Sequence, residues 1–442
     1  MKFTKKQIFR FAEHGEFGLE KESLRITKDG FIAETDHPFP GDPKRDRDFF
    51  EGQLEMITGV SNSVEELFHD LTKLHNETTA ALEHSRFPGS TAAHVRSGTA
   101  ESVRQAADEH HSPEYLWPFS NPPYIDDLDS IRIAAFTGKD AWKTEYRKHL
   151  EQVYGKKRML FSGIHMNFSF SSAYLEEYGS CSVSEFQNAL YLDLTKKILK
   201  YSWLIVYLTA ASPLLDGSYV DRDDLGKDIV TDYASIRTGQ YGYWNHFTPV
   251  LDFSSVEAYA DSIESYVENG MLMASSELYY PVRLKPRGAN STEHLKEAGA
   301  NHIELRMLDL NPLSPVGIDQ RDVSFIYLLL LYLMSEESPV MNEQEQLTAL
   351  ANLKHAAKLE ANSKSVIEAA EEILNRMKEF FIHSECSDSE TPNILRHASE
   401  ILDYQLQKVI DPEQRYAKQI VRQFGEGYVE KGLKLIGIRS NG

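Results

Sequence analysis

The chain has 442 residues, of which 41% are apolar and 26% are charged, an ordinary composition for a globular protein with a large core. Its net charge of −20, from 67 acidic and 47 basic side chains, argues against a nucleic acid or an anionic membrane as partner, because both attract basic surfaces. An anionic substrate is not excluded, since bound divalent cations can reverse the local field.

The number of cysteines and the length of the apolar runs bear on the cellular location of the protein. The two cysteines, Cys181 and Cys386, are far apart in the sequence, so we expect no disulfide framework and a reducing, cytoplasmic location. The segment MKFTKKQIFRFAEHGEFG lacks the apolar run of a secretory signal, and the longest apolar stretches are too short to cross a membrane.

The first element that we expect is a strand over residues 18–26, GLEKESLRI. Side chains alternate across a strand, so Glu20 and Glu22 project from one face. The pair Asp29-Gly30 predicts a tight turn that would join this strand to GFIAET as a hairpin. Two adjacent carboxylates imply either that this face is in water or that it holds a cation.

A second strand is expected over residues 48–60, DFFEGQLEMITGV, after a loop rich in proline and charge. The side chains that would share one face are Glu51, Gln53 and Glu55. Asp48 would point away from this face unless a bulge intervenes, for which Gly52 is a suitable position.

A helix should follow, because Ser63–Glu66 has the form of a capping box and apolar residues continue at helical spacing to Leu82. The segment LWPFSNPPYI is broken by proline and cannot be regular helix. We then expect one or two helices over residues 183–212, irregular loops over residues 216–247, and helices rich in Glu, Lys and Ala after Pro339.

Two later segments repeat the alternation of the first strand. In SGIHMNFSF, apolar residues take one face, and His165 and Asn167 take the other. In HIELRMLD, Ile303, Leu305 and Met307 take one face, and His302, Glu304 and Arg306 take the other. His165 could serve as a buried hydrogen-bonding histidine or as a metal ligand. Polar strands interleaved with long helices favour an α+β fold.

One amphipathic strand can simply face water, but four strands with carboxylate, imidazole, amide or guanidinium groups favour a metal site. On one concave surface, Glu20, Glu22, Glu55 and Glu304 would repel one another unless cations lay among them. Oxygen ligands with one histidine suit Mg²⁺ or Mn²⁺ rather than zinc. The sequence contains no Walker A motif, so a nucleotide would have to be held through metals and arginines.

Together and in this order, GLEKESLRI, DFFEGQLEMITGV, FSGIHMNFSF and IELRMLDLNPLSPVGID resemble the motifs of proteobacterial-type glutamate–cysteine ligases (γ-glutamylcysteine synthetases). The segments LWPFSNPPYI, YLTAASP, ASIRTGQYGY and ELYYPVRLKPR are similar to the connecting motifs of that family. The resemblance implies a curved antiparallel sheet that forms a funnel, as in glutamine synthetase, surrounded by helices. It also implies a catalytic ligase core over residues 1–338 and a C-terminal helical region over residues 339–442 packed on it.

The resemblance implies that ATP phosphorylates the γ-carboxylate of L-glutamate and that the amine of L-cysteine attacks the acyl phosphate, the first step of glutathione biosynthesis. Positions that match the metal ligands are Glu20, Glu22, Asp48, Glu55, His165 and Glu304, which would hold Mg²⁺ or Mn²⁺. Arg306 matches the arginine that steadies the transferring phosphoryl group. By the same match, Asn167, Arg237 and Tyr243 would bind the amino-acid substrates, and Arg283 and Arg287 would bind ATP. The expected partners are small molecules only.

The sequence departs from the family at Gly59, where proline is usual, and we expect this to alter a turn and leave the chemistry unchanged. Bifunctional relatives add an ATP-grasp domain, for which we expect this chain to be too short. Residues 217–242 and the loop before Glu304 are candidates for a lid. A different amine acceptor is the main alternative. An inactive regulatory or binding protein is another, but it would be expected to have lost an acidic ligand.

Overall fold

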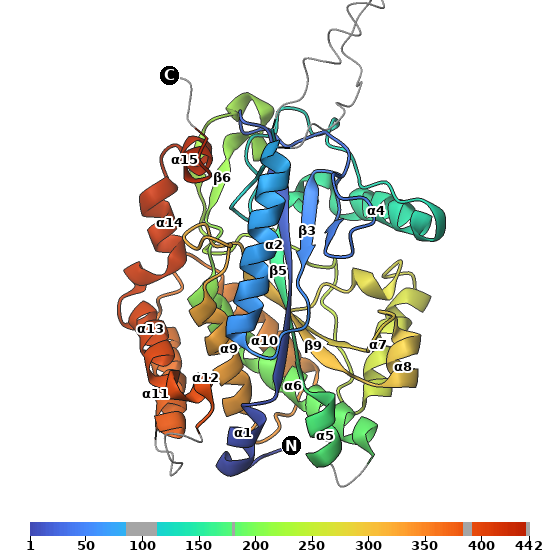
Figure 1. The fold of residues 1–442 in the computed structure, drawn as a ribbon, viewed down its shortest axis with the longest axis vertical. Helices are drawn as coiled ribbons and strands as arrows, with labels where there is room; N and C mark the ends of the chain where they lie inside the picture. The colour runs from blue at the N-terminus through green and yellow to red at the C-terminus, as the bar shows by residue number, and fades with distance from the viewer. Residues whose placement is uncertain (85–112, 179–181, 383–390, 439–442) are drawn as a thin grey trace, which may run out of the picture.

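The structure, a computed structural model, describes residues 1–84, 113–178, 182–382 and 391–438 (Figure 1). Its centre is an antiparallel sheet whose strands lie in the order β2 (Arg45–Arg47), β3 (Gln53–Ile57), β1 (Gly15–Ile26), β5 (Gly163–Phe170), β9 (His302–Asp309) and β8 (Val282–Lys285). The short β4 (Tyr115–Leu116) also pairs with β1. Helices and an antiparallel sheet confirm the α+β class, and the described sheet is open, with β2 and β8 at its edges.

One face of the sheet is apolar and buried against helices. Helix α6 (Val183–Thr209) contacts β8 and β9 and also packs on α9 (Gln320–Leu333), while α2 (Val64–His84) contacts β1 and α9. The strand residues on this side, among them Ile164, Met166 and Ile303, are fully buried in one large cluster. Burial of this face supplies the main driving force for the fold and leaves the opposite face for polar side chains.

The other helices surround this core (Figure 1). They are α1 (Lys5–Phe11), α4 (Ala141–Tyr154), α5 (Ser172–Tyr178), α7 (Val256–Glu268), α8 (Thr292–Ala298), α10 (Glu343–Ala356), α11 (Lys364–Ile382), α12 (Asn393–Arg396), α13 (Ala398–Ile410), α14 (Tyr416–Phe424) and α15 (Tyr428–Leu435). Figure 1 shows α11–α15 along one side of the molecule and α4, α7 and α8 on the other. Helix α10 packs on α6. No helix of the described residues is long and apolar enough to cross a membrane.

The predicted turn after β1 is present, but the hairpin is shorter than expected. Gly30 has φ +86°, and Thr27 N donates to Phe31 O at 2.8 Å. The returning segment makes only an isolated bridge between Ile26 and Ile32, because the chain leaves β1 after Ala33 for the proline-rich loop.

The prediction that a strand begins at Asp48 was wrong. Asp48 lies in the connection between β2 and β3, where its N donates to Gln53 O at 3.0 Å and Gln53 N donates to Phe50 O at 3.0 Å. No bulge at Gly52 is needed, because the chain reverses there. The charged edge strand β2 was not predicted, because its sequence RDR has no alternation of apolar and polar residues, which is the pattern that indicates a strand.

The predicted start and apolar stripe of α2 are confirmed. Ser63 Oγ accepts a hydrogen bond from Glu66 N at 3.1 Å, and Glu66 Oε2 accepts one from Asn62 N at 2.8 Å. The stripe Leu67, Leu71, Leu74, Thr78 and Leu82 is buried. Before the helix, Gly59 N donates to Asp70 Oδ2 at 2.8 Å, a bond that proline could not make.

The central part of the chain is less irregular than the sequence indicated. Helix α6 is a single helix of 27 residues. Residues 216–247 contain short turns of 3₁₀ helix and the strand β7 (Asp228–Val230), which pairs with β6 (Leu214–Asp216) in a two-stranded sheet. Cys181 and Cys386 lie outside the described residues.

Candidate active site

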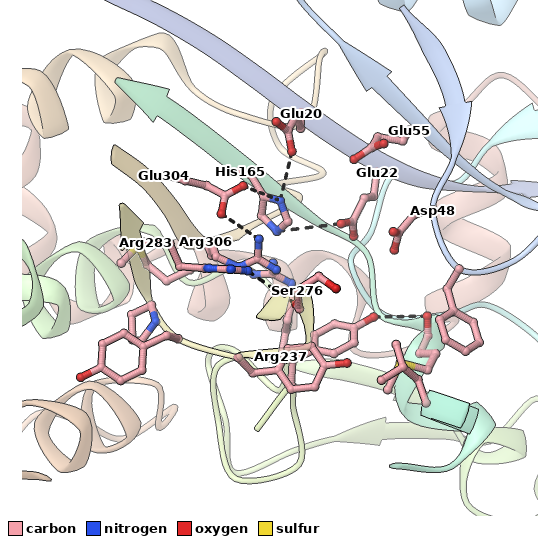
Figure 2. Close-up of a pocket in the computed structure, with 18 of the residues that line it drawn as sticks. Glu20, Glu22, Asp48, Glu55, His165, Arg237, Ser276, Arg283, Glu304 and Arg306 are labelled. Atoms are coloured by element: carbon pink, nitrogen blue, oxygen red, sulfur yellow. Dashed lines mark hydrogen bonds and ion pairs between the residues drawn. The ribbon is translucent and has the colours of Figure 1, made fainter. Parts of the chain in front are cut away.

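The polar face of the sheet brings the predicted carboxylates together. Glu20 of β1 is paired with His165 of β5, and Glu22 of β1 with Glu55 of β3, so these side chains share a face. Glu304 joins them from β9 (Figure 2). All five line a pocket of about 330 Å³.

An irregularity in strand pairing sets the position of His165. Ile164 pairs with Leu308 and Met166 pairs with Leu305, so β9 carries one extra residue opposite His165. Bulges of this kind re-aim side chains and occur often beside functional sites. The strict alternation assumed from the sequence therefore ends at this point of β9.

His165 lies among three carboxylates. Its Nδ1 is 3.4 Å from Glu20 Oε2 and 4.0 Å from Glu304 Oε1, and its Nε2 is 4.0 Å from Glu22 Oε1. Glu20, His165 and Glu304 each offer one ligand atom within 4.8 Å of the others. Burial, together with Arg306, lowers the pKa of His165, so the neutral ring keeps a lone pair for a cation.

Glu22, Asp48 and Glu55 form a second acidic group, on the side of His165 away from Glu304 (Figure 2). Burial and then Asp48 raise the pKa of Glu22 to about 8. Burial, Glu20 and Asp48 raise the pKa of Glu55 well above its usual value. Within the described residues, neither Glu22 nor Glu55 has an ion pair with lysine or arginine, so a cation would relieve their repulsion.

Glu304, by contrast, is held between two basic side chains. Lys285 Nζ lies 3.1 Å from its Oε1, and Arg306 Nη1 donates to its Oε2 at 2.9 Å. Burial alone would raise the pKa of Glu304, but Arg306 and Lys285 hold it well below its usual value. Burial opposes the charge of Arg306, yet Glu304 raises the pKa of Arg306 above normal. Both groups are therefore charged.

Arg237 occupies a slot made by a glycine. Its guanidinium donates to Leu308 O at 3.2 Å and lies 5.9 Å from the ring centre of Tyr243. A Cβ at Gly163 would be 2.2 Å from Arg237 Cζ, so only glycine leaves room for this side chain. The Tyr243 hydroxyl donates to Phe161 O at 2.6 Å, which fixes the ring at the wall of the pocket.

Two guanidinium groups in the pocket offer donors that the protein does not use. Arg237 Nε and Arg283 Nε are buried and have no hydrogen-bond partner among the described residues. The terminal nitrogens of Arg283 donate to the carbonyls of Ser275, at 3.0 Å, and Ser276, at 3.5 Å. A buried unsatisfied donor costs about 1–3 kcal/mol, so these groups suit an anionic ligand that accepts from them.

Two predicted binding residues do not line the pocket. Asn167 Nδ2 donates to Glu20 Oε1 at 2.9 Å and so orients a carboxylate. Arg287 is exposed and donates to Ser172 Oγ at 3.0 Å. Part of the lid candidate is also fixed: residues 234–239 are buried, and Ser235 Oγ donates to Asp309 Oδ1 at 3.0 Å.

Several lining residues were missed by sequence reasoning. Lys285 shares a face with Arg283 by the alternation used elsewhere, so PVRLK carried a usable signal. Helix α4 contributes Trp142, Tyr146 and Arg147, and Arg147 Nε donates to Asp48 O. Nothing in the sequence of α4 indicates that it lies beside the sheet.

A sequence profile of the family described as glutamate–cysteine ligase matches residues 2–100 and 88–356. The chain belongs to this family. The family membership that the four motifs predicted is confirmed.

Curated relatives that the chain matches include bifunctional proteins. The chain is 35% identical over 444 residues to the glutathione biosynthesis bifunctional protein GshAB of Listeria monocytogenes (strain F2365), covering 94% of this chain and 53% of that one. It is 30% identical over 448 residues to the protein of the same name from Clostridium perfringens, covering 95% of this chain and 53% of that one. The chain thus spans about half the length of these relatives.

Solved structures share the fold. A bifunctional glutathione synthetase from Pasteurella multocida matches with a TM-score of 0.76 and 29% identity, over 98% of this chain and 53% of that one. A glutamate–cysteine ligase from Francisella tularensis, in complex with AMP, matches with a TM-score of 0.76 over 96% of this chain and 87% of that one. At 21% identity, the second match shows the fold alone.

Proposed function

We propose that the protein joins the γ-carboxylate of L-glutamate to the amine of L-cysteine with ATP, through a γ-glutamyl phosphate, in the first step of glutathione biosynthesis. The observation that carries this proposal is the pocket on the polar face of the sheet, in a chain of the glutamate–cysteine ligase family. A γ-carboxylate oxygen would attack the γ-phosphorus of ATP and release ADP. The amine nitrogen would then attack the acyl carbon, lose a proton and release phosphate.

The donor set of the pocket fits Mg²⁺ or Mn²⁺. Oxygen ligands would come from Glu20, Glu22, Asp48, Glu55 and Glu304, and a nitrogen ligand from His165. The pKa values of Glu22 and Glu55, which burial and then neighbouring carboxylates raise, support this fit, because a bound cation would stabilise the charged forms of both groups. Bound cations would supply charge neutralisation for the phosphates.

Basic residues of the chain would position the phosphoryl group. Arg306 is held by Glu304, so it would stand as a fixed cation while charge develops on the transferring group. Arg283 has a free Nε–H in the same pocket and would donate to a phosphate oxygen of ATP. Arg287 is assigned to ATP by the motif match alone and would have to move to reach it.

The amino-acid substrates would bind on the side of Arg237 and Tyr243. The free Nε–H of Arg237 suits a carboxylate of glutamate. Asn167 would act indirectly, by orienting Glu20. Closure of the exposed parts of residues 217–242 and of the loop before Glu304 would keep water from the acyl phosphate.

We also propose that the sheet forms a funnel of the glutamine synthetase kind. Residues 1–338 would form the catalytic ligase core, and residues 339–442 a helical region packed on it. The family match to residue 356 and the place of Leu353 in the pocket lining support a close association of α10 with the core. With few cysteines and small-molecule substrates, the protein would work in the cytoplasm.

The test is to incubate the purified protein with ATP, Mg²⁺ and glutamate and to follow ADP release with cysteine, without it, or with other amines in its place. We expect cysteine-dependent ADP release and γ-glutamylcysteine, identified by mass spectrometry. Glu304→Gln should lower kcat by a factor of about 10² or more, because it weakens the hold on Arg306 and removes a ligand charge.

Glu16→Gln is the matched control, since Glu16 lies on β1 four residues before Glu20 and does not line the pocket. It should keep full activity. Turnover with another amine, and none with cysteine, would refute the acceptor but keep the mechanism. Absence of turnover with every amine, in protein with an intact melting transition, would refute the proposed activity.

A further inference from the structure

A second cavity lies behind the active site, on the other side of β1. It has a volume of about 480 Å³ and is bounded by β1, α2, the segment that begins with β4, and the loop after β9. Lys21, which lies between Glu20 and Glu22 in the sequence, points into it from the opposite face of the strand. This cavity is distinct from the pocket that holds the carboxylates.

Lys21 has a buried amino group without a carboxylate partner, and burial lowers its pKa to about 7. Its residue is 3% exposed, and within the described residues it forms no ion pair with a carboxylate. Its Nζ lies 3.2 Å from His75 Nδ1 on α2, and burial and Lys21 lower the pKa of His75 to about 3, so His75 is neutral. Glu83 lines the cavity but is exposed and forms no ion pair with Lys21. Buried charges are normally paired, because an unpaired one is costly to desolvate.

Two hydroxyl groups that line the same cavity also lack hydrogen-bond partners. Ser23 Oγ and Thr79 Oγ1 are buried without a hydrogen-bond partner, and both residues line this cavity. Native structures contain few such groups, and here two of them accompany the buried amino group of Lys21. Ammonium and hydroxyl groups together form a set of donors suited to an anion.

Most of the remaining wall is apolar. It includes Leu116, Trp117, Leu313 and Ile436. The loop after β9 approaches Lys21 closely because Gly317, with φ +83°, has no Cβ; an added Cβ would lie 3.1 Å from Lys21 Cε. The cavity therefore combines a few polar donors with largely apolar walls, and its volume is in the range of small-molecule sites.

We propose that this cavity binds an organic carboxylate with an apolar body, whose carboxylate lies against Lys21, Ser23 and Thr79. Bare inorganic phosphate would satisfy the donors but leave the apolar walls without contact. The occupant would contact β1 directly behind Glu20 and Glu22. The inference does not depend on the proposed ligase activity, because binding is measured without turnover.

The experiment is calorimetric titration of the full-length protein with 4-methylpentanoate and benzoate, each compared with its neutral amide. We expect one carboxylate per chain and an affinity at least about tenfold lower for the amides, since a charge-assisted bond is lost. Lys21→Met should also weaken carboxylate binding at least about tenfold. Lys73→Met, an exposed lysine on the same helix as His75, is the matched control and should bind normally.

Two further variants keep the test decisive. Thr79→Val removes one hydroxyl with little change of shape and should weaken binding about threefold to tenfold even if Lys21→Met fails to fold. Arg237→Met removes a cation from the catalytic pocket and should leave this binding unchanged. The proposal is overturned if no carboxylate binds, if phosphate binds as tightly as the apolar carboxylates, or if Arg237→Met abolishes binding while Lys21→Met does not.

Discussion

At the residue scale, the carboxylates of the candidate site differ in whether a basic side chain is paired with them. Glu304 is paired with both Lys285 and Arg306, whereas Glu22 and Glu55 have no ion pair with lysine or arginine among the described residues. The metal-free protein is thus balanced at one end of the pocket and acidic at the other. A cation should therefore be held most tightly where the carboxylates are least compensated.

Gly163→Ala tests whether the slot for Arg237 matters. The added Cβ would meet the guanidinium, so Arg237 must move, and we expect a loss of about 1–3 kcal/mol of stability together with a higher KM for glutamate. Thermal unfolding and steady-state kinetics measure the two effects. Gly18→Ala is the control, because a Cβ there would find its nearest neighbour, Asn167 Cβ, at 3.8 Å. If the two variants had the same stability and the same KM for glutamate, the slot at Gly163 would not be needed to position Arg237.

His75→Gln tests the electrostatics behind β1. The pKa of His75 is about 3 in the folded protein and about 6.5 when unfolded, so the unfolded chain binds more protons between these values. His75 therefore destabilises the fold as pH drops below 6.5, by about 2 kcal/mol at pH 5. The difference in unfolding free energy between variant and wild type should shift by this amount between pH 7 and pH 5. A difference independent of pH would contradict the assignment.

At the element scale, the strands explain why alternation was a good guide and where it failed. It correctly placed Glu20, Glu22 and His165 on one face, because strands β1 and β5 are regular at these positions. It could not show the turn that carries Asp48 or the extra residue in β9 opposite His165. Both depend on how neighbouring strands pair, which a single strand's pattern does not contain.

Glu55→Gln tests the crowding of carboxylates between β1 and β3. Replacing this carboxyl should stabilise the metal-free protein by about 1–3 kcal/mol at pH 7, because burial and the neighbouring acids raise the pKa of Glu55, so folding has to protonate it, whereas glutamine is neutral in both states. The same change should weaken Mg²⁺ binding. Melting temperatures without Mg²⁺ measure the expected gain in stability, and the rise in melting temperature on adding Mg²⁺ measures the expected loss of metal binding. Glu34→Gln, at an exposed position, serves as control, and a destabilised metal-free Glu55→Gln would refute the argument.

At the scale of the whole molecule, the C-terminal helices are tied to the core by buried charged groups. Arg415, 1% exposed, donates to Tyr207 O at the end of α6, at 3.2 Å, and to Leu359 O, at 3.1 Å. Lys408 of α13 forms a 3.0 Å ion pair with Asp322 of α9. Such contacts imply that α13 and α14 unfold together with the sheet and its helices.

Arg415→Met tests this coupling. It leaves buried carbonyls without their donor, so we expect a loss of about 2–4 kcal/mol in a single unfolding transition, measured by denaturant titration. Arg422→Met is the control, since Arg422 is exposed and pairs with Glu413 at the surface. Two separate transitions in the variant or the wild type would contradict a single cooperative unit.

The sequence by itself determined the fold class, the family and the carboxylates of the polar face, because these follow from local periodicity and contiguous motifs. Tertiary structure alone decided which basic groups lie near those carboxylates: Lys285 in an ion pair with Glu304, Arg237 in the slot at Gly163, and Arg147 from α4. It alone also enclosed Lys21 in a second cavity. These contacts join segments that are far apart in the chain. Contacts between such segments produce no periodic pattern in the sequence from which they could be predicted.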